Sequence, residues 1–379
     1  MARFRPVPLV RLLRDMMVYA STALDLGFYT LAFRDESASY EVVHIERLVE
    51  ELWERAVAEA SLAVRTISEA EAMISVFRVV DSLLRVTEAA GELAGLVLRG
   101  VEPPPLLREA LLSGAEVTAP LRISGRVRVG ELEDAGVDVV AVRRGSEWIL
   151  NPGDDVVLEP GDVAIIRGSP CNVARVAGLT LPEARGGVVE RETLRLKKLA
   201  DVILDLGFYS ILYGDEVIAL HVLEMEHRLD DDMLYYYELV SKLGLSPQQE
   251  YALHKFAEAV ENVSDAAAAM AAMVRAKRPV HVVIAAAEDQ STERILALQY
   301  VGEERVTLAD TGLIREEVIV LAVRRGAKHW VPSPSPDTPL EKGDVVIVKT
   351  YAENLEEVIR IAEEHGLRPM EKHVAEHLA

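Results

Sequence analysis

Apolar side chains recur every three to four residues over long stretches of this chain. Residues 11–99 carry this pattern, and the segment 51–73 within them is especially rich in helix-forming residues. The pattern returns over residues 192–243 and 248–276. Such spacing places the apolar side chains on one face of a helix. It predicts three long amphipathic helices in each region, packed as an antiparallel bundle with a short fourth element.

Turn-forming and helix-capping residues divide these long periodic stretches. A break is expected near Asp35-Glu36-Ser37 and another at Gly244-Leu245-Ser246-Pro247. In the second break, Ser246 has the chemistry of an N-cap, and Pro247 suits the first helical position, where no backbone N–H is needed.

The stretches that follow each helical region are short and rich in β-branched residues, and turn signals such as Asn151-Pro152-Gly153-Asp154 separate them. They predict a small α+β domain after each bundle. The expected strands are Val117–Ile123, Val137–Arg143, Glu147–Leu150 and Val163–Arg167, then Ile295–Tyr300, Val318–Arg324, Trp330–Val331 and Val345–Lys349. The expected helices are Val127–Ala135, Ala352–Glu364 and a short amphipathic tail at Met370–Ala379.

The chain repeats itself at a nearly constant spacing, which indicates a tandem duplication of a unit of about 180 residues. Three motifs recur in the same order, at shifts of 180, 181 and 182: Asp25-Leu26-Gly27-Phe28-Tyr29 at Asp205–Tyr209, Ala141-Val142-Arg143-Arg144-Gly145 at Ala322–Gly326, and Leu158-Glu159-Pro160-Gly161-Asp162-Val163 at Leu340–Val345.

The fold class expected from these patterns is an α+β multidomain protein, in which a three-helix bundle followed by a small α+β domain occurs twice. The expected boundaries are 1–108 for the first bundle, 109–182 for the first α+β domain, 183–290 for the second bundle and 291–379 for the second α+β domain.

The α+β halves resemble the C-terminal ligand-binding domain (RCK_C) of TrkA-type potassium-transport regulators. The resemblance rests on Val139–Gly145, Trp148, Pro152 and Leu158–Val163, in that order and spacing. In the second copy it rests on Val320–Gly326, Pro332 and Leu340–Val345. The helical halves resemble PhoU-like domains through their helix pattern and carboxylate spacing. Neither copy carries the Gly-rich dinucleotide-binding half with G-x-G-x-x-G after a strand, so gating by NAD, NADH or ATP through such a domain is not expected.

These resemblances imply a cytosolic regulatory subunit of a membrane cation transporter or channel, with potassium as the first expectation. TrkA C-terminal domains form dimers, and some bind a small anionic effector such as a cyclic dinucleotide at the dimer interface. A duplicated chain could supply both halves of such a dimer, and a homodimer remains the alternative. The second hypothesis is a PhoU-type metal-binding regulator of phosphate uptake, and a metal-dependent hydrolase is a remote third. No enzyme is expected, because the sequence lacks a P-loop, a G-x-S-x-G elbow and paired His/Cys metal motifs.

Composition narrows the partners. The formal net charge is −21, which disfavours binding to nucleic acid and to anionic membrane surfaces. The single cysteine, Cys171, excludes an intrachain disulfide and indicates a reducing compartment. No uninterrupted apolar run approaches the length of a membrane span, so no direct membrane insertion is expected. The expected location is therefore cytoplasmic, peripheral to the inner face of the membrane through a transporter partner.

Acidic residues spaced four apart on the predicted helices are candidate ligands for a hard divalent ion such as Mg²⁺, Mn²⁺, Ca²⁺ or iron. PhoU-like domains hold metal ions on such pairs. The second copy carries Glu226, Asp230, Glu261 and Asp265, whereas the first keeps only Glu46, Glu50 and Glu88, because Leu84 stands where the second copy has Glu261. The alternative is that these pairs are solvated faces of an acidic protein. His44, His221 and His227 lie near them in the sequence and are weaker candidates.

The Arg-Arg-Gly turns are the candidate effector site. Arg143, Arg144, Arg324 and Arg325 each end a predicted strand in an otherwise acidic chain. The planar guanidinium binds phosphate or carboxylate at two points, so these residues could hold an anionic effector. The alternative is that they pair with acids of the same domain, such as Glu147 or Asp162.

Overall fold

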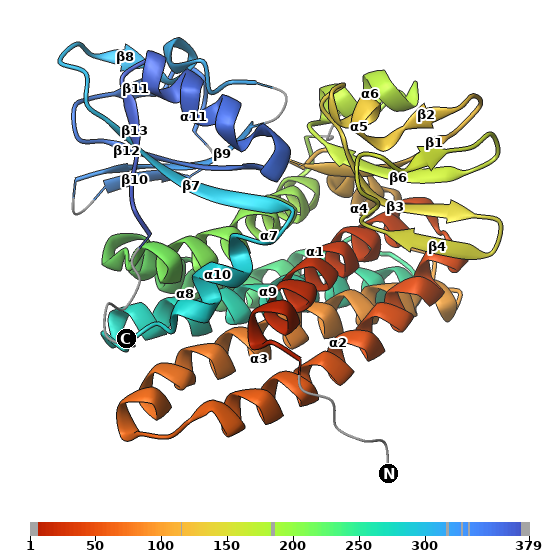
Figure 1. The fold of residues 1–379 in the computed structure, drawn as a ribbon. Helices are drawn as coiled ribbons and strands as arrows, with labels where there is room; N and C mark the ends of the chain where they lie inside the picture. The colour runs from red at the N-terminus through yellow and green to blue at the C-terminus, as the bar shows by residue number, and fades with distance from the viewer. Residues whose placement is uncertain are drawn as a thin grey trace.

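The fold is that of a computed structural model, which describes residues 7–114, 116–182, 186–315, 318–326, 329–332 and 334–372. Long helices form one side of the molecule, and two small sheet-containing domains lie next to each other on the other side (Figure 1). This arrangement confirms the expected α+β architecture of a bundle followed by a small α+β domain, twice over.

Each copy begins with three long helices and a short fourth, as the periodicity predicts. In the first copy these are α1 (Leu9–Phe33), α2 (Glu36–Ala63), α3 (Ile67–Leu98) and α4 (Pro105–Leu111). In the second they are α7 (Val188–Tyr213), α8 (Glu216–Ser241), α9 (Pro247–Arg275) and α10 (Val282–Glu288).

The helix ends agree with the capping chemistry of the sequence. Asp35 caps α2 by accepting a hydrogen bond from the Ala38 N–H at 3.1 Å. Ser246 caps α9 by accepting from the Gln249 N–H at 3.3 Å, and Pro247 occupies the first turn. Each cap satisfies a backbone donor that would otherwise lack a partner at the start of the helix.

The two bundles pack against each other through α3 and α9. At this contact the Ser82 hydroxyl donates to the Ala266 carbonyl at 3.0 Å. Within each copy the repeated glycine lets two helices approach closely: a Cβ at Gly27 would lie 3.2 Å from the Ala90 Cα, and one at Gly207 would lie 2.9 Å from the Ala267 Cα. Glycine is therefore required in the repeated Asp-Leu-Gly-Phe-Tyr motif by helix packing.

The two α+β domains share one strand order. The main sheet of the first copy has the order β1-β6-β3-β4, and that of the second has the matching order β7-β12-β9-β10 with β13 added beside β7. All pairs are antiparallel, and a two-stranded sheet, β2-β5 or β8-β11, accompanies each. The strands are β1 (Val117–Arg122), β2 (Val127–Arg128), β3 (Asp138–Arg144), β4 (Glu147–Leu150), β5 (Val157–Leu158), β6 (Val163–Gly168), β7 (Glu293–Tyr300), β8 (Val306–Thr307), β9 (Val318–Arg325), β10 (His329–Pro332), β11 (Pro339–Leu340), β12 (Val345–Tyr351) and β13 (Leu367–Pro369).

Both copies also carry the same strand irregularity. The register of β3 against β6 shifts between Val139 and Ala141, and that of β9 against β12 shifts between Val320 and Ala322. The extra residues, Val140 and Leu321, occupy equivalent positions at the shift of 181 that relates the two Arg-Arg-Gly motifs. A shared bulge of this kind supports a common origin for the two domains.

Helices α5 (Val129–Glu133), α6 (Pro170–Ala177) and α11 (Leu355–Glu364) complete the domains, together with the 3₁₀ turns η1 (Leu308–Thr311) and η2 (Ala352–Asn354). The prediction of a helix over Val127–Ala135 was wrong at its start, because Val127 and Arg128 pair with β5 as strand β2. The helix predicted from Ala352 begins as η2 and becomes α-helical only at Leu355.

Each main sheet is covered on both faces, and alternation along a strand decides which side chain faces which core. In β6, Val163 and Ile165 join the large core shared with the helices, whereas Ala164 and Ile166 join the domain's own core. In β12 the residues facing the helices are Val345 and Ile347. This period of two places the next residue of the same series, Arg167 or Lys349, toward the bundle.

Most of the predicted tail helix, residues 373–379, lies outside the described residues, and Leu367–Pro369 before it forms β13.

Among the described residues one helix, α1, is long and apolar enough to cross a membrane, and 67% of its most apolar stretch is buried inside the protein. A buried core helix has the same composition, so the apolarity of α1 is accounted for by packing.

Candidate functional site: the cavity between the two copies

An ion pair joins each α+β domain to the bundle of its own copy. Arg143 Nη1 lies 3.3 Å from Asp35 Oδ1, and Arg324 Nε lies 3.0 Å from Asp215 Oδ2. Both aspartates also cap the second helix of their bundle. The Tyr29 hydroxyl donates to Asp35 at 3.0 Å, and Tyr209 makes the same bond to Asp215 at 3.1 Å. We call these two contacts the Arg–Asp joints.

The second arginine of each turn stays within its own domain. Arg144 donates to Asp162 and to the Val157 carbonyl, and the Asp162 side chain is almost completely buried. Arg325 repeats this arrangement with Asp344, whose Oδ2 lies 3.0 Å from Arg325 Nη2, and with the Pro339 carbonyl. The Arg144 guanidinium holds the pKa of Asp162 below its usual range through a hydrogen bond. The alternative of local pairing with Asp162 is therefore what the structure contains.

All four candidate arginines thus form ion pairs inside the chain, and the structure does not gather them at one point. Their contact with an effector stays a prediction. Trp148 and Trp330 pack partly buried against the main core, as expected of core residues. Arg143 lies over the Trp148 ring at 5.8 Å, and His221 stacks on Trp330.

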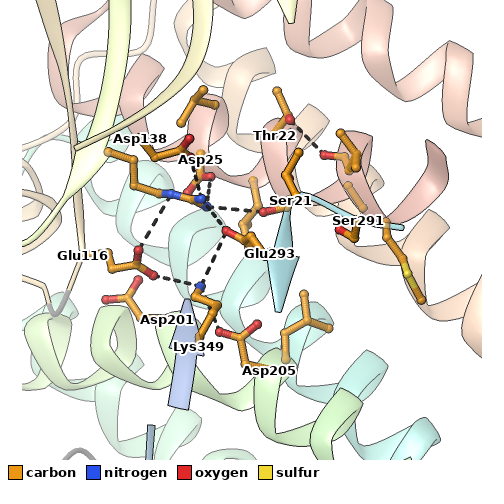
Figure 2. A pocket seen from close by; sticks show the side chains of 18 of the residues that line it. Ser21, Thr22, Asp25, Glu116, Asp138, Asp201, Asp205, Ser291, Glu293 and Lys349 are labelled. Carbon is orange, nitrogen blue, oxygen red and sulfur yellow. Dashed lines mark hydrogen bonds and ion pairs between the residues drawn. The ribbon is translucent and has the colours of Figure 1, made fainter. Parts of the chain in front are cut away.

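A cavity of about 110 Å³ lies where the two copies meet. Its walls come from α1 and α7, from the start of β1 and of β7, and from the bundle-facing ends of β6 and β12 (Figure 2). One part of the wall is apolar and includes Met17, Phe28 and Phe208, and another part carries charged side chains. Elements of all four domains therefore share one enclosed space.

Arg167 is the first centre of this charged part. Its guanidinium lies 2.6 Å from an oxygen of Asp25 on α1 and 2.7 Å from one of Asp138 on β3, and it also pairs with Glu293 at the start of β7. Arg167 is only 5% exposed. The Arg167–Glu293 pair crosses from the first copy to the second.

Lys349 is the second centre, and its contacts cross in the opposite direction. Its Nζ lies 3.1 Å from Glu116, in front of β1, and 3.0 Å from Asp205 on α7. Glu293 lies 3.9 Å away. We call Arg167, Lys349, Asp25, Asp138, Glu116, Asp205 and Glu293 the central charge cluster.

The central charge cluster follows the internal repeat. Arg167 and Lys349 correspond at a shift of 182, Asp25 and Asp205 at 180. Glu116 and Glu293 correspond at 177, the shift at which Thr118 opposite Arg167 matches Ile295 opposite Lys349. Each basic residue therefore contacts the helix aspartate of its own copy and the strand glutamate of the other. The cavity lies near the pseudo-twofold axis that this exchange defines.

Burial and neighbouring carboxylates change the acidity of the cluster. Burial raises the pKa of Asp25 to about 7, with Glu116 and Glu293 adding to the rise and Arg167 opposing it. Burial raises the pKa of Asp205 to about 6, and Lys349 opposes this rise. The pKa of Asp138 is raised for the same reason, whereas Arg167 and Lys349 lower that of Glu293 against its burial. Part of the cluster therefore changes protonation near neutral pH.

The sequence reasoning missed this cluster. The strand was expected at Val163–Arg167, yet its last residue, Arg167, pairs with four carboxylates at the interface: Asp25, Glu116, Asp138 and Glu293. A signal was present, because Asp25 and Asp205 lie inside a repeated, mostly apolar helix motif. A charged residue kept in both copies of a buried helix indicates a buried partner.

The carboxylates predicted to hold a metal face each other across α8 and α9. Burial raises the pKa of Glu226, Glu261 and Asp265, and in each case Asp230 adds to the rise. In the first copy burial and then Glu88 and Glu50 raise the pKa of Glu46. Within the described ranges, however, no three His, Cys, Asp or Glu side chains are placed so that they could hold a metal ion. The metal site stays a prediction.

The remaining candidates have ordinary surroundings. His221 pairs with Glu224 at 3.2 Å besides stacking on Trp330. His227 lies close enough to Glu226 to oppose the rise of its pKa, and His44 acts on Glu41 in the same way. Cys171 is exposed in the first turn of α6, after the N-cap Ser169, as a helix start at Ser169-Pro170 predicts.

Comparison with known proteins identifies the α+β domains. The TrkA-C domain family matches residues 115–180 and 305–362. These two segments lie within the first and second α+β domains, so the recognition of this domain from Val139–Gly145 and its repeat is confirmed. No curated protein matches the chain significantly.

Solved structures similar to this chain include PhoU from Pseudomonas aeruginosa, at 14% identity and a TM-score of 0.39, over 70% of this chain and 91% of that one. The GsuK RCK domain is 12% identical with a TM-score of 0.17, over 75% and 78% of the two chains. The GsuK channel bound to NAD is 12% identical with a TM-score of 0.19, over 78% and 66%. Scores below 0.5 do not establish a common fold.

Proposed function

We propose that this protein is a cytoplasmic regulatory subunit of a membrane potassium transporter or channel. Two TrkA-C domains in one chain support this proposal. The chain would sense a small ligand and pass the bound state to its membrane partner without catalysing a reaction.

The observation that carries the proposal is the physical connection between the TrkA-C domains and the bundles. Each Arg–Asp joint fixes a TrkA-C domain to the N-terminus of α2 or α8. The central charge cluster then ties both domains to α1 and α7. A ligand that binds one arrangement of the two domains more tightly shifts the population toward it. The bundles would follow as rigid bodies.

We also infer that the two TrkA-C domains act as an intrachain pair. The reciprocal contacts Arg167–Glu293 and Lys349–Glu116 support this, because they form an interface between the two copies of one chain. In a dimer of single domains, two separate chains would form that interface. Light scattering should then give the mass of one chain. A dimer that forms at micromolar concentration would favour the homodimer alternative.

Effector binding is tested by calorimetry with cyclic dinucleotides and other nucleotides. If Arg144 and Arg325 contact an anionic effector, the Arg144→Ala/Arg325→Ala variant loses the heat of binding. The matched control is Asp162→Asn/Asp344→Asn, which weakens the same ion pairs but keeps both arginines. Loss in the alanine variant alone supports direct contact. No heat with any nucleotide in the wild type would contradict an anionic effector at this site.

Regulation is tested by potassium flux into vesicles that contain the candidate transporter, with and without the protein. The Arg143→Ala/Arg324→Ala variant, which breaks both Arg–Asp joints, should fold but lose its influence on flux. Flux that is unaffected by the wild-type protein and by every effector tried would overturn the proposal.

A second candidate, a PhoU-type metal-binding regulator of phosphate uptake, is favoured by one observation: burial, and then repulsion from Asp230 and Asp265, raises the pKa values of Glu226 on α8 and Glu261 on α9. Divalent metal would relieve that repulsion. Elemental analysis of the purified protein tests this candidate, because metal lost in the Glu226→Ala/Glu261→Ala variant would support it.

A further inference from the structure

We propose that the cavity between the two copies is a binding site for a small organic diamine, one with two ammonium groups joined by a short apolar carbon chain. The inference deepens the proposed function by naming a ligand class, and its regulatory meaning rests on that function. Binding to the cavity rests only on the charges, contacts and lining residues described below.

The first argument is an imbalance of buried charge. The central charge cluster contains five carboxylates and two basic groups, and the carboxylate side chains are between 10% and 18% exposed. Lys197, the third basic residue of the cavity wall, is engaged by Asp201 and does not offset the excess. Uncompensated buried charge is costly. Protonation of Asp25 and Asp205, whose pKa values are raised, relieves part of this excess near neutral pH, and a bound cation would compensate the rest.

The second argument comes from unpartnered atoms in the same wall. Glu116 Oε1 and Arg167 Nε are buried, and neither has a hydrogen-bond partner among the described residues. They lie 3.8 Å apart, too far for a hydrogen bond to each other. Glu116 is 8% and Arg167 5% exposed, and both line the cavity. A ligand ammonium would donate to Glu116, and a ligand oxygen or water carried with it would accept from Arg167.

The geometry favours an organic ammonium over a bare metal ion. A metal ion needs several ligands at short distance, and no set of three such side chains is so placed in the part of the chain that the structure describes. An ammonium group has three donors that can bond separate acceptors. The carboxylates of the central charge cluster are spread apart, so they suit the separate donors of an ammonium group better than the close ligand shell of a metal ion.

The apolar wall shows where the ammonium would lie. Lys197 Nζ lies over the Phe28 ring at 4.7 Å from its centre. At the shift of 180, Lys197 corresponds to Met17, Asp201 to Ser21 and Phe28 to Phe208. No cation lies over Phe208 among the described side chains. One ammonium group of the ligand would lie over the face of Phe208, in the position equivalent to that of the Lys197 ammonium over Phe28.

The size of the cavity is adequate for such a ligand. Its volume of about 110 Å³ is several times what one water molecule requires. Leu24, Leu204 and Phe208 offer contact to a chain of a few methylene groups. Because the wall includes α1, α7, β6 and β12, occupancy would act on both bundles and both TrkA-C domains at once.

Putrescine is the probe, measured by calorimetry and by the shift of the melting temperature, with 1,4-butanediol as its uncharged counterpart and KCl and MgCl₂ as inorganic cations. Putrescine should bind, and butanediol should not. Glu116→Gln should weaken binding by about tenfold or more, because a charged hydrogen bond is lost. The exposed Glu303→Gln variant removes the same charge elsewhere and should bind like the wild type.

A second variant tests the position without removing any charge of the central cluster. Met17→Lys/Ser21→Asp copies the Lys197–Asp201 pair into the other half, so it should fold, stay as stable as the wild type and lose putrescine binding. Undiminished binding in this variant would overturn the assignment to the cavity. No binding of putrescine by the wild type, or equal binding of butanediol, would overturn the proposal itself.

The outcomes separate this inference from the proposed function. Amine binding that leaves potassium flux unchanged would contradict only the regulatory role of the cavity. Regulation of flux without any amine binding would contradict only the cavity site. Binding of Mg²⁺ or K⁺ that displaces putrescine and survives Glu116→Gln would assign the cavity to an inorganic ion instead.

Discussion

The two copies agree closely at the Arg–Asp joints and differ across the cavity. At the joints, Arg143–Asp35 and Arg324–Asp215 use the same residue types, the same helix caps and the same tyrosine hydrogen bond. Across the cavity, the first copy has Met17 and Ser21 where the second has a buried lysine and aspartate. The two copies therefore connect their domains with the same contacts, whereas only the second copy supplies a cation of its own, Lys197, to this part of the cavity wall.

The candidate metal-binding carboxylates on the helices also differ between the copies, and again the second copy carries more charged residues. The second copy has acidic residues on both α8 and α9, whereas Leu84 replaces one of them in the first copy. The copies therefore differ at these candidate ligand positions, whereas the packing positions Gly27 and Gly207 are unchanged.

The largest effect is expected at the central charge cluster, where the copies differ by arginine against lysine. Arg167→Met leaves Asp25, Asp138 and Glu293 without their main partner and should lower the free energy of unfolding by about 3–5 kcal/mol. Urea unfolding measures it. Lys349→Arg makes the two copies alike and should cost far less. Equal losses in the two variants would mean that side-chain packing at this interface, and not charge, sets the cost.

Breaking the Arg–Asp joints should have a smaller effect that is the same in both copies. Asp35→Ala and Asp215→Ala each remove a helix cap and an ion pair, and each should cost about 1–2 kcal/mol. Thermal unfolding of the two variants gives the comparison. Asp35→Asn, which can still cap α2, should recover part of the loss. A difference of more than about 1 kcal/mol between the copies would show that the joints are not equivalent.

The pH dependence of the unfolding free energy tests the central charge cluster through substitutions that keep the size and shape of each side chain. The pKa values of Asp25 and Asp205 in the folded protein, about 7 and about 6, lie above that of an unfolded aspartate. The folded state therefore binds more protons between about pH 4 and 7, and the contribution of these groups to stability falls as pH rises through that window. Asp25→Asn/Asp205→Asn should flatten this part of the curve of unfolding free energy against pH. An unchanged slope would contradict the assignment.

The smallest effect is expected from divalent metal on the helical carboxylates. If the second copy binds Mn²⁺, a concentration equal to the dissociation constant stabilises it by only about 0.4 kcal/mol. Glu261→Leu gives α9 the residue that α3 has at Leu84 and should abolish the melting shift. Leu84→Glu is the reciprocal change. A shift that persists in Glu261→Leu would place any bound metal elsewhere.

The sequence by itself determined the duplication, the long helices, their caps and most strands. These features depend on local spacing: apolar periodicity, N-caps such as Ser246 and β-branched runs such as Val163–Arg167. The repeated motifs also predicted the TrkA-C domains. Prediction from the sequence failed where pairing with a distant strand determined the local structure, as at Val127 and Arg128.

Only the tertiary structure decided which charged residues meet. Glu116, Arg167 and Glu293 lie far apart in the chain, at three separate strand ends, and no local pattern distinguishes them from surface charges. Packing of the two copies removes water from them and forces each charge to find a partner. The imbalance of the cluster, and with it the cavity's preference for a cation, exists because those partners come from both halves of the duplication.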